Sequence, residues 1–396
     1  MRGFKTIKKQ PTQPQSQPQY EVADVLNKLG SKLENLELNS WQLRTLFALK
    51  KCRTSALGGH IDACDECGNV SISYNSCRNR HCPKCQGKNR EQWIENRETE
   101  LLPVPYFHVV FTLPDVLNKT ALHEPKMLYD ILFESAWETL QTFGKNKNLQ
   151  MGMIAVLHTW GQNLSLHPHL HCIVPGGGVD ESGTWKNLHS DGKFLFPVKA
   201  LSKVFRAKFC EKLKANLKDK FNENQENEYE KIRQSLWEKP WVVYAKKPFG
   251  SPKSVVEYLG RYSHKIAVSN QRIRKIDAET VTFSYKDYRQ KGIKKQMVLS
   301  HEEFIRRFAM HILPKRFVKI RHYGFLSSTW KREKLKILQQ KLGIQTKEKP
   351  LSKVFQPKCS CCKVGNLVTI ATFDLRGPPQ WFLEMSRNLP APKSAF

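Results

Sequence analysis

The sequence predicts an α+β fold in which a small cysteine-rich module precedes a larger domain built on a β-sheet. Strand-like runs of β-branched and aromatic residues alternate with helical patterns through the middle of the chain. Five of the 11 cysteines lie between positions 64 and 85. The apolar fraction of 40% is enough to bury a sizeable core, and 396 residues fit two or three domains.

The N-terminal region is predicted to contain a tether and short helices. Residues 8–19 are rich in proline and glutamine and have nothing to bury, so we expect a disordered tether over residues 1–20. From Val22 to Cys52 apolar residues recur at helical spacing, and Asn39 with Ser40 marks the start of a second helix. We place an N-terminal domain at residues 21–100.

The central domain, residues 101–325, is predicted from alternating strands and helices. The expected elements are a strand at Tyr106–Leu113, a helix at 124–147, strands at Met153–Trp160 and His169–Val174, a helix at 199–237, a strand at Trp241–Ala245 and a helix at Val255–Ser263. Residues 326–396 form a basic C-terminal tail. Its single CxxC pair, in Cys359-Ser-Cys361-Cys362, has no second pair nearby, and we assign it no function.

The N-terminal cysteines have the spacing of a zinc site. Two CxxC pairs can each form a tight knuckle that directs two sulfurs at one ion. The predicted ligands are Cys64, Cys67, Cys82 and Cys85, with Cys77 or His81 as possible replacements and a redox dithiol as the competing interpretation. Cations surround the cluster, which is typical of a module that contacts phosphates, although a purely structural role is the alternative. The candidate DNA-binding residues here are Arg78, Arg80, Lys84 and Lys88.

The charge of the chain predicts a polyanionic partner. Lysine and arginine total 65 against 36 acidic residues, a net charge of +29 that is spread over the whole chain. An anionic membrane is the other partner that such a charge could suit. No run approaches 18 apolar residues and the N-terminus has no apolar signal core, so we expect a soluble, cytosolic protein.

The segment His167-Pro-His169-Leu-His171 predicts a catalytic metal site. Side chains alternate along a strand, so His169 and His171 share one face while Leu170 points into the core. A divalent ion held there could polarise a phosphoryl oxygen. The leading candidate for a third ligand is Gln162, with His167 or a carboxylate elsewhere as alternatives. A hydrogen-bonded structural cluster is the competing interpretation.

A tyrosine pair follows about ninety residues later. Tyr258 and Tyr262 are four residues apart, so on a helix their hydroxyls lie on one face and could attack phosphodiesters. Ordinary helix packing is the alternative for this spacing. Gly260 between them would let a backbone or a nucleotide approach closely. Arg261 and Lys265 add positive charge for a nearby phosphate.

The order of the motifs resembles a known family. The cysteine cluster, FHVVFTLP, LHTWGQNLSLHPHLHCIVPGGG and EYLGRYSHKIAVSN together resemble the two-tyrosine HUH transposases of rolling-circle insertion sequences, the family named for insertion sequence 91. The resemblance covers roughly residues 25–325. It implies an HUH nuclease domain with a ferredoxin-like or RRM-like antiparallel sheet flanked by helices. It also implies that His169 and His171 are the metal pair, that Gln162 fits a polar third ligand, and that Tyr258 and Tyr262 are the nucleophiles.

The same resemblance implies an activity. The enzyme would cut single-stranded DNA at an insertion-sequence end, retain the 5′ phosphate on a tyrosine and transfer the strand to target DNA, using Mg²⁺ or Mn²⁺. It would act in the cytoplasm of a prokaryote, at the nucleoid. A plasmid replication initiator or relaxase with the same chemistry is one alternative. A non-catalytic zinc-ribbon DNA-binding protein is the other, and it predicts that His169→Ala and His171→Ala leave all activity in place.

Overall fold

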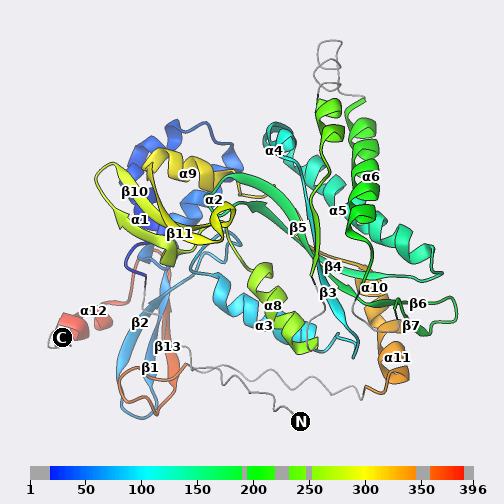
Figure 1. Ribbon diagram of the computed structural model, residues 1–396. Coiled ribbons are helices and arrows are strands. Elements are labelled where there is room, and N and C mark those ends of the chain that lie inside the picture. Colours follow the sequence, from blue (N-terminus) through cyan, green and yellow to red (C-terminus); the bar gives the residue numbers. More distant parts are fainter. Residues whose placement is uncertain (1–17, 190–193, 219–231, 247–251, 345–356, 388–396) are drawn as a thin grey trace, which may run out of the picture.

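The computed structural model describes residues 18–189, 194–218, 232–246, 252–344 and 357–387. These residues form helices together with one five-stranded, two three-stranded and one two-stranded sheet, so the prediction of an α+β fold is confirmed (Figure 1). The predicted tether, apart from its last three residues, lies outside the described part of the chain. Among the described residues, no helix combines the length and the apolar character needed to cross a membrane.

A five-stranded antiparallel sheet lies at the centre of the molecule (Figure 1). Its order is β12-β4-β5-β3-β8, and every neighbouring pair is antiparallel. The strands are β3 (Tyr106–Thr112), β4 (Gly152–Trp160), β5 (Leu166–Pro175), β8 (Val243–Lys246) and β12 (Ile320–Gly324). The first four match the predicted strands to within three residues, whereas β12 was not predicted.

The alternation of side chains gives this sheet two differently covered faces. Phe111 and Leu170 belong to the large core beneath α5 and α6. Tyr106 and Ile173 point the other way, into a smaller core that includes Val255 of α8. The helices are α3 (Gln86–Glu98), α4 (Asn118–His123), α5 (Pro125–Lys145), α6 (Val198–Lys218), α8 (Pro252–Ser263), α10 (Ser328–Arg332) and α11 (Lys334–Lys341). The short hairpin of β6 (Gly177–Val179) and β7 (Trp185–Asn187) follows β5.

The N-terminal helices share a core with a second sheet. As predicted, two helices precede the cysteine cluster, and Asn39 caps the second by accepting a hydrogen bond from the Gln42 N–H. Leu26 and Leu46 pack in one cluster with Phe283 and Phe304, so these helices are buried against a segment more than 200 residues away. The elements are α1 (Val22–Leu29), α2 (Ser40–Lys50), β9 (Ile273–Ile276), β10 (Thr280–Asp287), β11 (Ile293–Ser300) and α9 (His301–Ala309).

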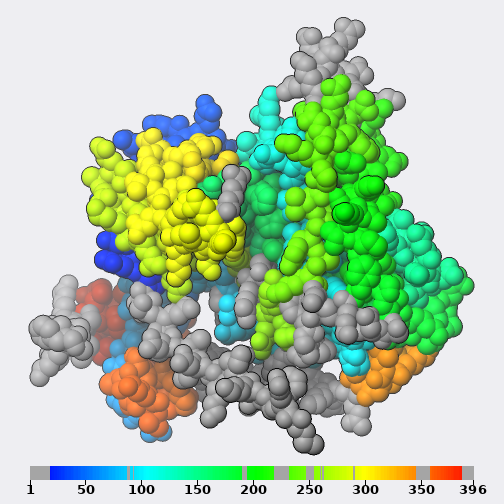
Figure 2. Space-filling model, in the orientation of Figure 1, coloured from blue at the N-terminus to red at the C-terminus, as the bar shows by residue number. Residues whose placement is uncertain are grey.

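The third sheet joins the two ends of the chain. Its order is β13-β1-β2, so a strand from the predicted basic tail pairs with the hairpin that contains the first cysteines. The space-filling view shows these C-terminal residues, in orange and red, lying beside N-terminal residues in blue (Figure 2). The elements are β1 (Gly59–Cys64), β2 (Val70–Tyr74), β13 (Leu367–Phe373) and α12 (Gln380–Arg387).

Candidate active site and metal centres

Three histidines meet on the face of the central sheet that α8 covers. His158 of β4 lies directly opposite His169 of β5, and His171 follows two residues along the same strand. One ring nitrogen of each lies within 4.8 Å of the others. His158 is 2% exposed and His171 9%, which places the group below the surface. The arrangement can hold a metal ion by three imidazoles from two adjacent strands.

The imidazoles are held in the form that binds metals. The Nδ1 of His169 lies 2.7 Å from the carbonyl oxygen of His167, so Nδ1 carries the proton and Nε2 presents its lone pair. Burial lowers the pKa of His169 to about 4, and it lowers the pKa of His171 far below its usual value. Both rings are therefore neutral at pH 7.

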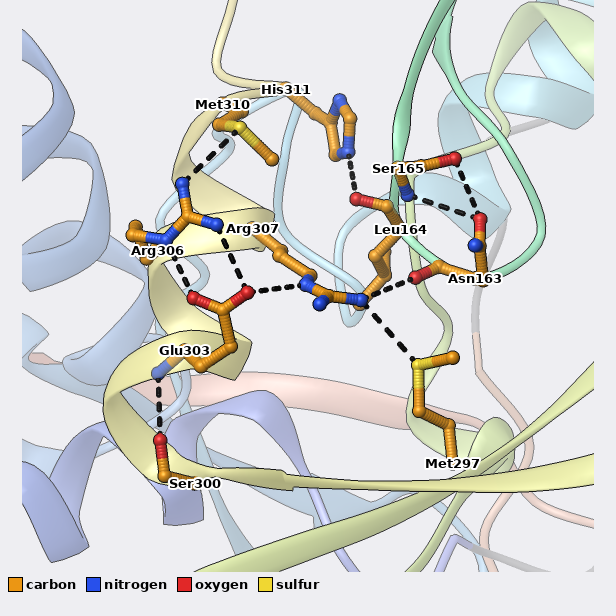
Figure 3. A network of polar contacts seen from close by, with 10 residues as sticks. All are labelled: Asn163, Leu164, Ser165, Met297, Ser300, Glu303, Arg306, Arg307, Met310 and His311. Atoms are coloured by element: carbon orange, nitrogen blue, oxygen red, sulfur yellow. Dashed lines mark hydrogen bonds and ion pairs between the residues drawn. The ribbon is translucent and has the colours of Figure 1, made fainter.

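The turn between β4 and β5 is fastened to α9 and the residues after it (Figure 3). The carbonyl of Leu164 accepts a hydrogen bond from His311 Nε2 at 3.2 Å, and the carbonyl of Asn163 accepts one from Arg307. Arg307 is in turn paired with Glu303 at 2.6 Å. These contacts fix the hairpin that carries the histidines.

Gln162, the predicted third ligand, lies in this turn. Its backbone carbonyl accepts a hydrogen bond from Arg272, and its side chain is half-buried. The histidine that the structure adds to the predicted pair is His158, which sequence reasoning missed. A role for Gln162 as a ligand stays a prediction, and so does a role for His167, whose side chain is exposed and whose carbonyl orients His169.

Tyr258 approaches the histidine group through His108. The Tyr258 hydroxyl lies 3.4 Å from Nδ1 of His108, whose Nε2 lies 2.8 Å from Nδ1 of His171. His108 is 3% exposed, and burial lowers its pKa to about 4. It belongs to β3, on the sheet face that carries His171, so the sheet brings a ring between the tyrosine and the candidate ligand. Sequence reasoning noted the strand of His108 but not this residue.

Close packing of α8 against α3 sets the place of Tyr258. A Cβ atom at Gly260 would lie 2.4 Å from Cδ1 of Ile94 in α3, so only glycine fits there without a shift. The structure thus places a neighbouring helix where the sequence suggested a backbone or nucleotide. Tyr262 lies one turn further along α8, and its side chain and that of Arg261 are outside the described residues.

The cysteines form two groups of four rather than the predicted one. The first group, here called the N-terminal cluster, contains Cys52, Cys77, Cys82 and Cys85. Sulfurs in it lie 3.5 and 3.7 Å apart. Zinc–sulfur bonds of about 2.3 Å at tetrahedral angles place sulfurs about 3.8 Å apart, so the spacing is that of a zinc tetrathiolate.

The predicted ligand set of Cys64, Cys67, Cys82 and Cys85 is therefore wrong as a single site. Cys64 and Cys67 lie at the tip of the β1–β2 hairpin, whereas the N-terminal cluster lies at its base. The chain reaches Cys77 through strand β2 and not through a loop that folds back. Because the six residues of β1 span roughly 20 Å, cysteines at the tip and at the base of the hairpin are too far apart to share one ion. Cys77, named as an alternative, does join the cluster, whereas His81 Nε2 accepts the Leu313 N–H.

The predicted DNA-binding residues differ in their surroundings. Arg78 and Arg80 are exposed beside the N-terminal cluster, and Arg80 donates to the carbonyl of Phe317. Lys84 already has partners within the fold, because its ammonium pairs with Glu21 and donates to the carbonyl of Cys52. Lys265 is exposed just after α8, and the side chain of Lys88 lies outside the described residues.

Comparison with known proteins shows which family this chain resembles. Residues 152–334 match the family model described as "Putative transposase", and residues 24–113 match the "Transposase zinc-binding domain" of insertion sequence 91. The chain is 41% identical over 388 residues to "Putative transposase y4qJ" of Sinorhizobium fredii, covering 91% of this chain and 97% of that protein. It is 31% identical over 306 residues to "Transposase for insertion sequence element IS801" of Pseudomonas savastanoi, covering 75% and 73%. No solved structure matches the chain.

Proposed function

Because the chain belongs to the insertion sequence 91 family of transposases, we propose that it cuts and rejoins single-stranded DNA by HUH chemistry at the histidine group. The observation that carries this proposal is the line from Tyr258 through His108 to His171 on one face of the sheet. It joins a candidate nucleophile to a candidate metal ligand. The substrates would be the single-stranded ends of the insertion sequence and the target DNA.

The histidine group suits a divalent cation. His158, His169 and His171 would hold it, each through one ring nitrogen, and the remaining positions would be open to phosphate oxygens and water. Of the two expected ions, Mn²⁺ fits this all-nitrogen set better than Mg²⁺, which prefers oxygen ligands. When bound, the ion would withdraw charge from a non-bridging oxygen of the scissile phosphate.

In the proposed reaction Tyr258 is a nucleophile. Its hydroxyl oxygen bonds to phosphorus, the bond from phosphorus to the 3′ oxygen breaks, and the 3′ oxygen gains the proton that the tyrosine loses. The protein then carries the 5′ phosphate as a tyrosine ester, and a free 3′ hydroxyl can later reverse the step on another strand. Tyr262, one helical turn away, would provide the second nucleophile.

His108 is proposed to position the Tyr258 oxygen. A metal ligated by Nε2 of His171 leaves the proton of that ring on Nδ1, which then donates to Nε2 of His108. His108 must in that case carry its own proton on Nδ1, the atom that faces Tyr258. It would therefore donate to the tyrosine oxygen and stabilise the negative charge that develops on it.

The test is trapping of the covalent product. The full chain is incubated with Mn²⁺ and labelled single-stranded oligonucleotides that span each end of its insertion element, and denaturing gels report protein–DNA adducts. We expect adducts with the native chain, fewer with Tyr258→Phe or Tyr262→Phe, and none with both. Tyr288→Phe is the matched control, since Tyr288 is 70% exposed on the β10–β11 connection. Adducts that persist in the double variant would refute tyrosine catalysis.

A further inference from the structure

Four cysteines from opposite ends of the chain meet at the tip of the β1–β2 hairpin. Cys64 and Cys67 lie in a knuckle at the end of β1, and Cys359 and Cys362 lie in a knuckle just before β13. The sulfurs of Cys64 and Cys362 are 3.6 Å apart, and those of Cys67 and Cys359 are 3.8 Å apart. These distances match the value of about 3.8 Å expected between sulfurs around one zinc ion.

The two knuckles share a backbone turn. The residue after each second cysteine has a positive φ, +68° at Gly68 and +61° at Lys363. In each knuckle the N–H of that residue donates to the carbonyl of the first cysteine, at 3.1 Å to Cys64 and 3.0 Å to Cys359. A left-handed residue is costly for lysine, so its occurrence at the matching position indicates a required turn.

Backbone N–H groups also point at the sulfurs. The N–H of Cys67 lies 3.5 Å from Cys64 Sγ, the N–H of Cys361 lies 3.3 Å from Cys359 Sγ, and the N–H of Gly365 lies 3.3 Å from Cys362 Sγ. Such donors favour the thiolate form, which is the form that ligates zinc. Thiolates this close together would repel one another without a cation between them.

The knuckles are fitted closely to each other. A Cβ at Gly365 would lie 2.4 Å from Cys64 Sγ, so glycine is required for the approach. The Asp65 carboxylate accepts from the backbone N–H of Asn366 at 2.7 Å and from its side-chain amide at 3.2 Å. Strand pairing continues directly from this contact, with Cys64 opposite Leu367.

Apolar burial contributes little to the attachment of β13 to the β1–β2 hairpin. Val368 and Ile370 of β13 are 47% and 51% exposed. Within the described part of the chain, none of the three hydrophobic clusters includes a residue of β13. Small modules without a core of their own are commonly held together by disulfides or metals, and all four cysteines are free thiols here.

We propose that Cys64, Cys67, Cys359 and Cys362 bind a second, structural zinc ion that fastens residues 357–387 to the N-terminal hairpin. With the N-terminal cluster, the chain would then bind two zinc ions through eight thiolates. This ion makes the C-terminal segment part of the zinc-binding module rather than a basic tail. The proposal is independent of the DNA chemistry proposed above.

Alkylation of the native, full-length chain tests the proposal. Cys67 and Cys361 are both exposed, but only Cys67 belongs to the group of four, so the two form a matched pair. Iodoacetamide followed by mass spectrometry should modify Cys361 at once and Cys67 only after a zinc chelator is added. Equal modification of the two residues before chelation would overturn the proposal.

Metal content gives a second measurement. The purified chain should contain two zinc ions, the paired variant Cys359→Ser with Cys362→Ser should contain one, and the control Cys361→Ser should keep two. A native chain with one zinc ion, or a paired variant that still holds two, would refute the second site. The alkylation result does not depend on whether the paired variant folds.

Discussion

Replacing His158 tests the assignment of the third metal ligand. In a group of three imidazoles, removing one leaves two donors, and Mn²⁺ affinity should fall at least 100-fold, about 2.7 kcal/mol. The change His158→Ala should therefore weaken Mn²⁺ binding and adduct formation together. In Gln162→Ala the carbonyl that Arg272 contacts is retained, and we expect Mn²⁺ affinity to change less than threefold.

The assay is Mn²⁺ titration of each variant, with binding measured by calorimetry or electron paramagnetic resonance. His167→Ala is the matched control, because that histidine is exposed and adjacent in sequence to the group. His158 is 2% exposed, so thermal unfolding must first show that the variant is folded. Mn²⁺ binding that survives in His158→Ala but is lost in Gln162→Ala would refute the three-histidine site in favour of the predicted glutamine.

Three further perturbations address the neighbours of the site. His108→Phe should lower the rate of adduct formation about 100-fold but Mn²⁺ affinity only about tenfold. The reason is that His108 contacts the Tyr258 hydroxyl directly and would reach the metal only through His171. Equal losses in both measurements would contradict a positioning role. Gly260→Ala places a Cβ 2.4 Å from Cδ1 of Ile94, so the Ile94 side chain or α8 must shift to reach ordinary contact, and adduct formation should slow by up to about tenfold. Adding Ile94→Ala should restore the rate, and failure to do so would disprove the steric cause. Burial lowers the pKa of His311 to about 4 from 6.5, so this group stabilises the fold above pH 6.5 and that contribution is lost as the pH falls toward 4. Between pH 6.5 and pH 4 the free energy of unfolding in urea should therefore fall by about 3 kcal/mol less for His311→Gln than for the native chain. Parallel pH profiles for the two proteins would contradict this.

Strand parity was enough to predict two of the three members of the histidine group. Alternation alone places His169 and His171 on one face and Leu170 in the core, and the structure agrees. His158 could not be placed in this way because its face depends on the register of the hairpin. Counting back from the pair Trp160–Leu166 would set His158 opposite Pro168, on the wrong face. A register shift between His158 and Trp160 instead sets it opposite His169.

The zinc ligands show a different limit of sequence reasoning. CxxC pairs predict knuckles correctly, but they do not state which knuckles share an ion. Cys67 and Cys359 are separated by 292 positions and become neighbours only because β13 pairs with β1. In the same way the partner of Tyr258 is a histidine 150 positions earlier, which no local pattern connects to the tyrosine helix.

The structural metal centre and the reaction site are linked through α3. This helix begins directly after Cys85 of the N-terminal cluster, and its Ile94 fills the space over Gly260 of α8. Since α8 carries Tyr258, the cluster fixes the start of the helix against which the tyrosine helix rests. Removing zinc from the N-terminal cluster should therefore displace Tyr258 from His108. The second zinc ion has no such connection to Tyr258, because the strand that it attaches, β13, pairs with β1. The two zinc ions should thus differ in effect, the first acting on the geometry of catalysis and the second on the attachment of the C-terminal segment.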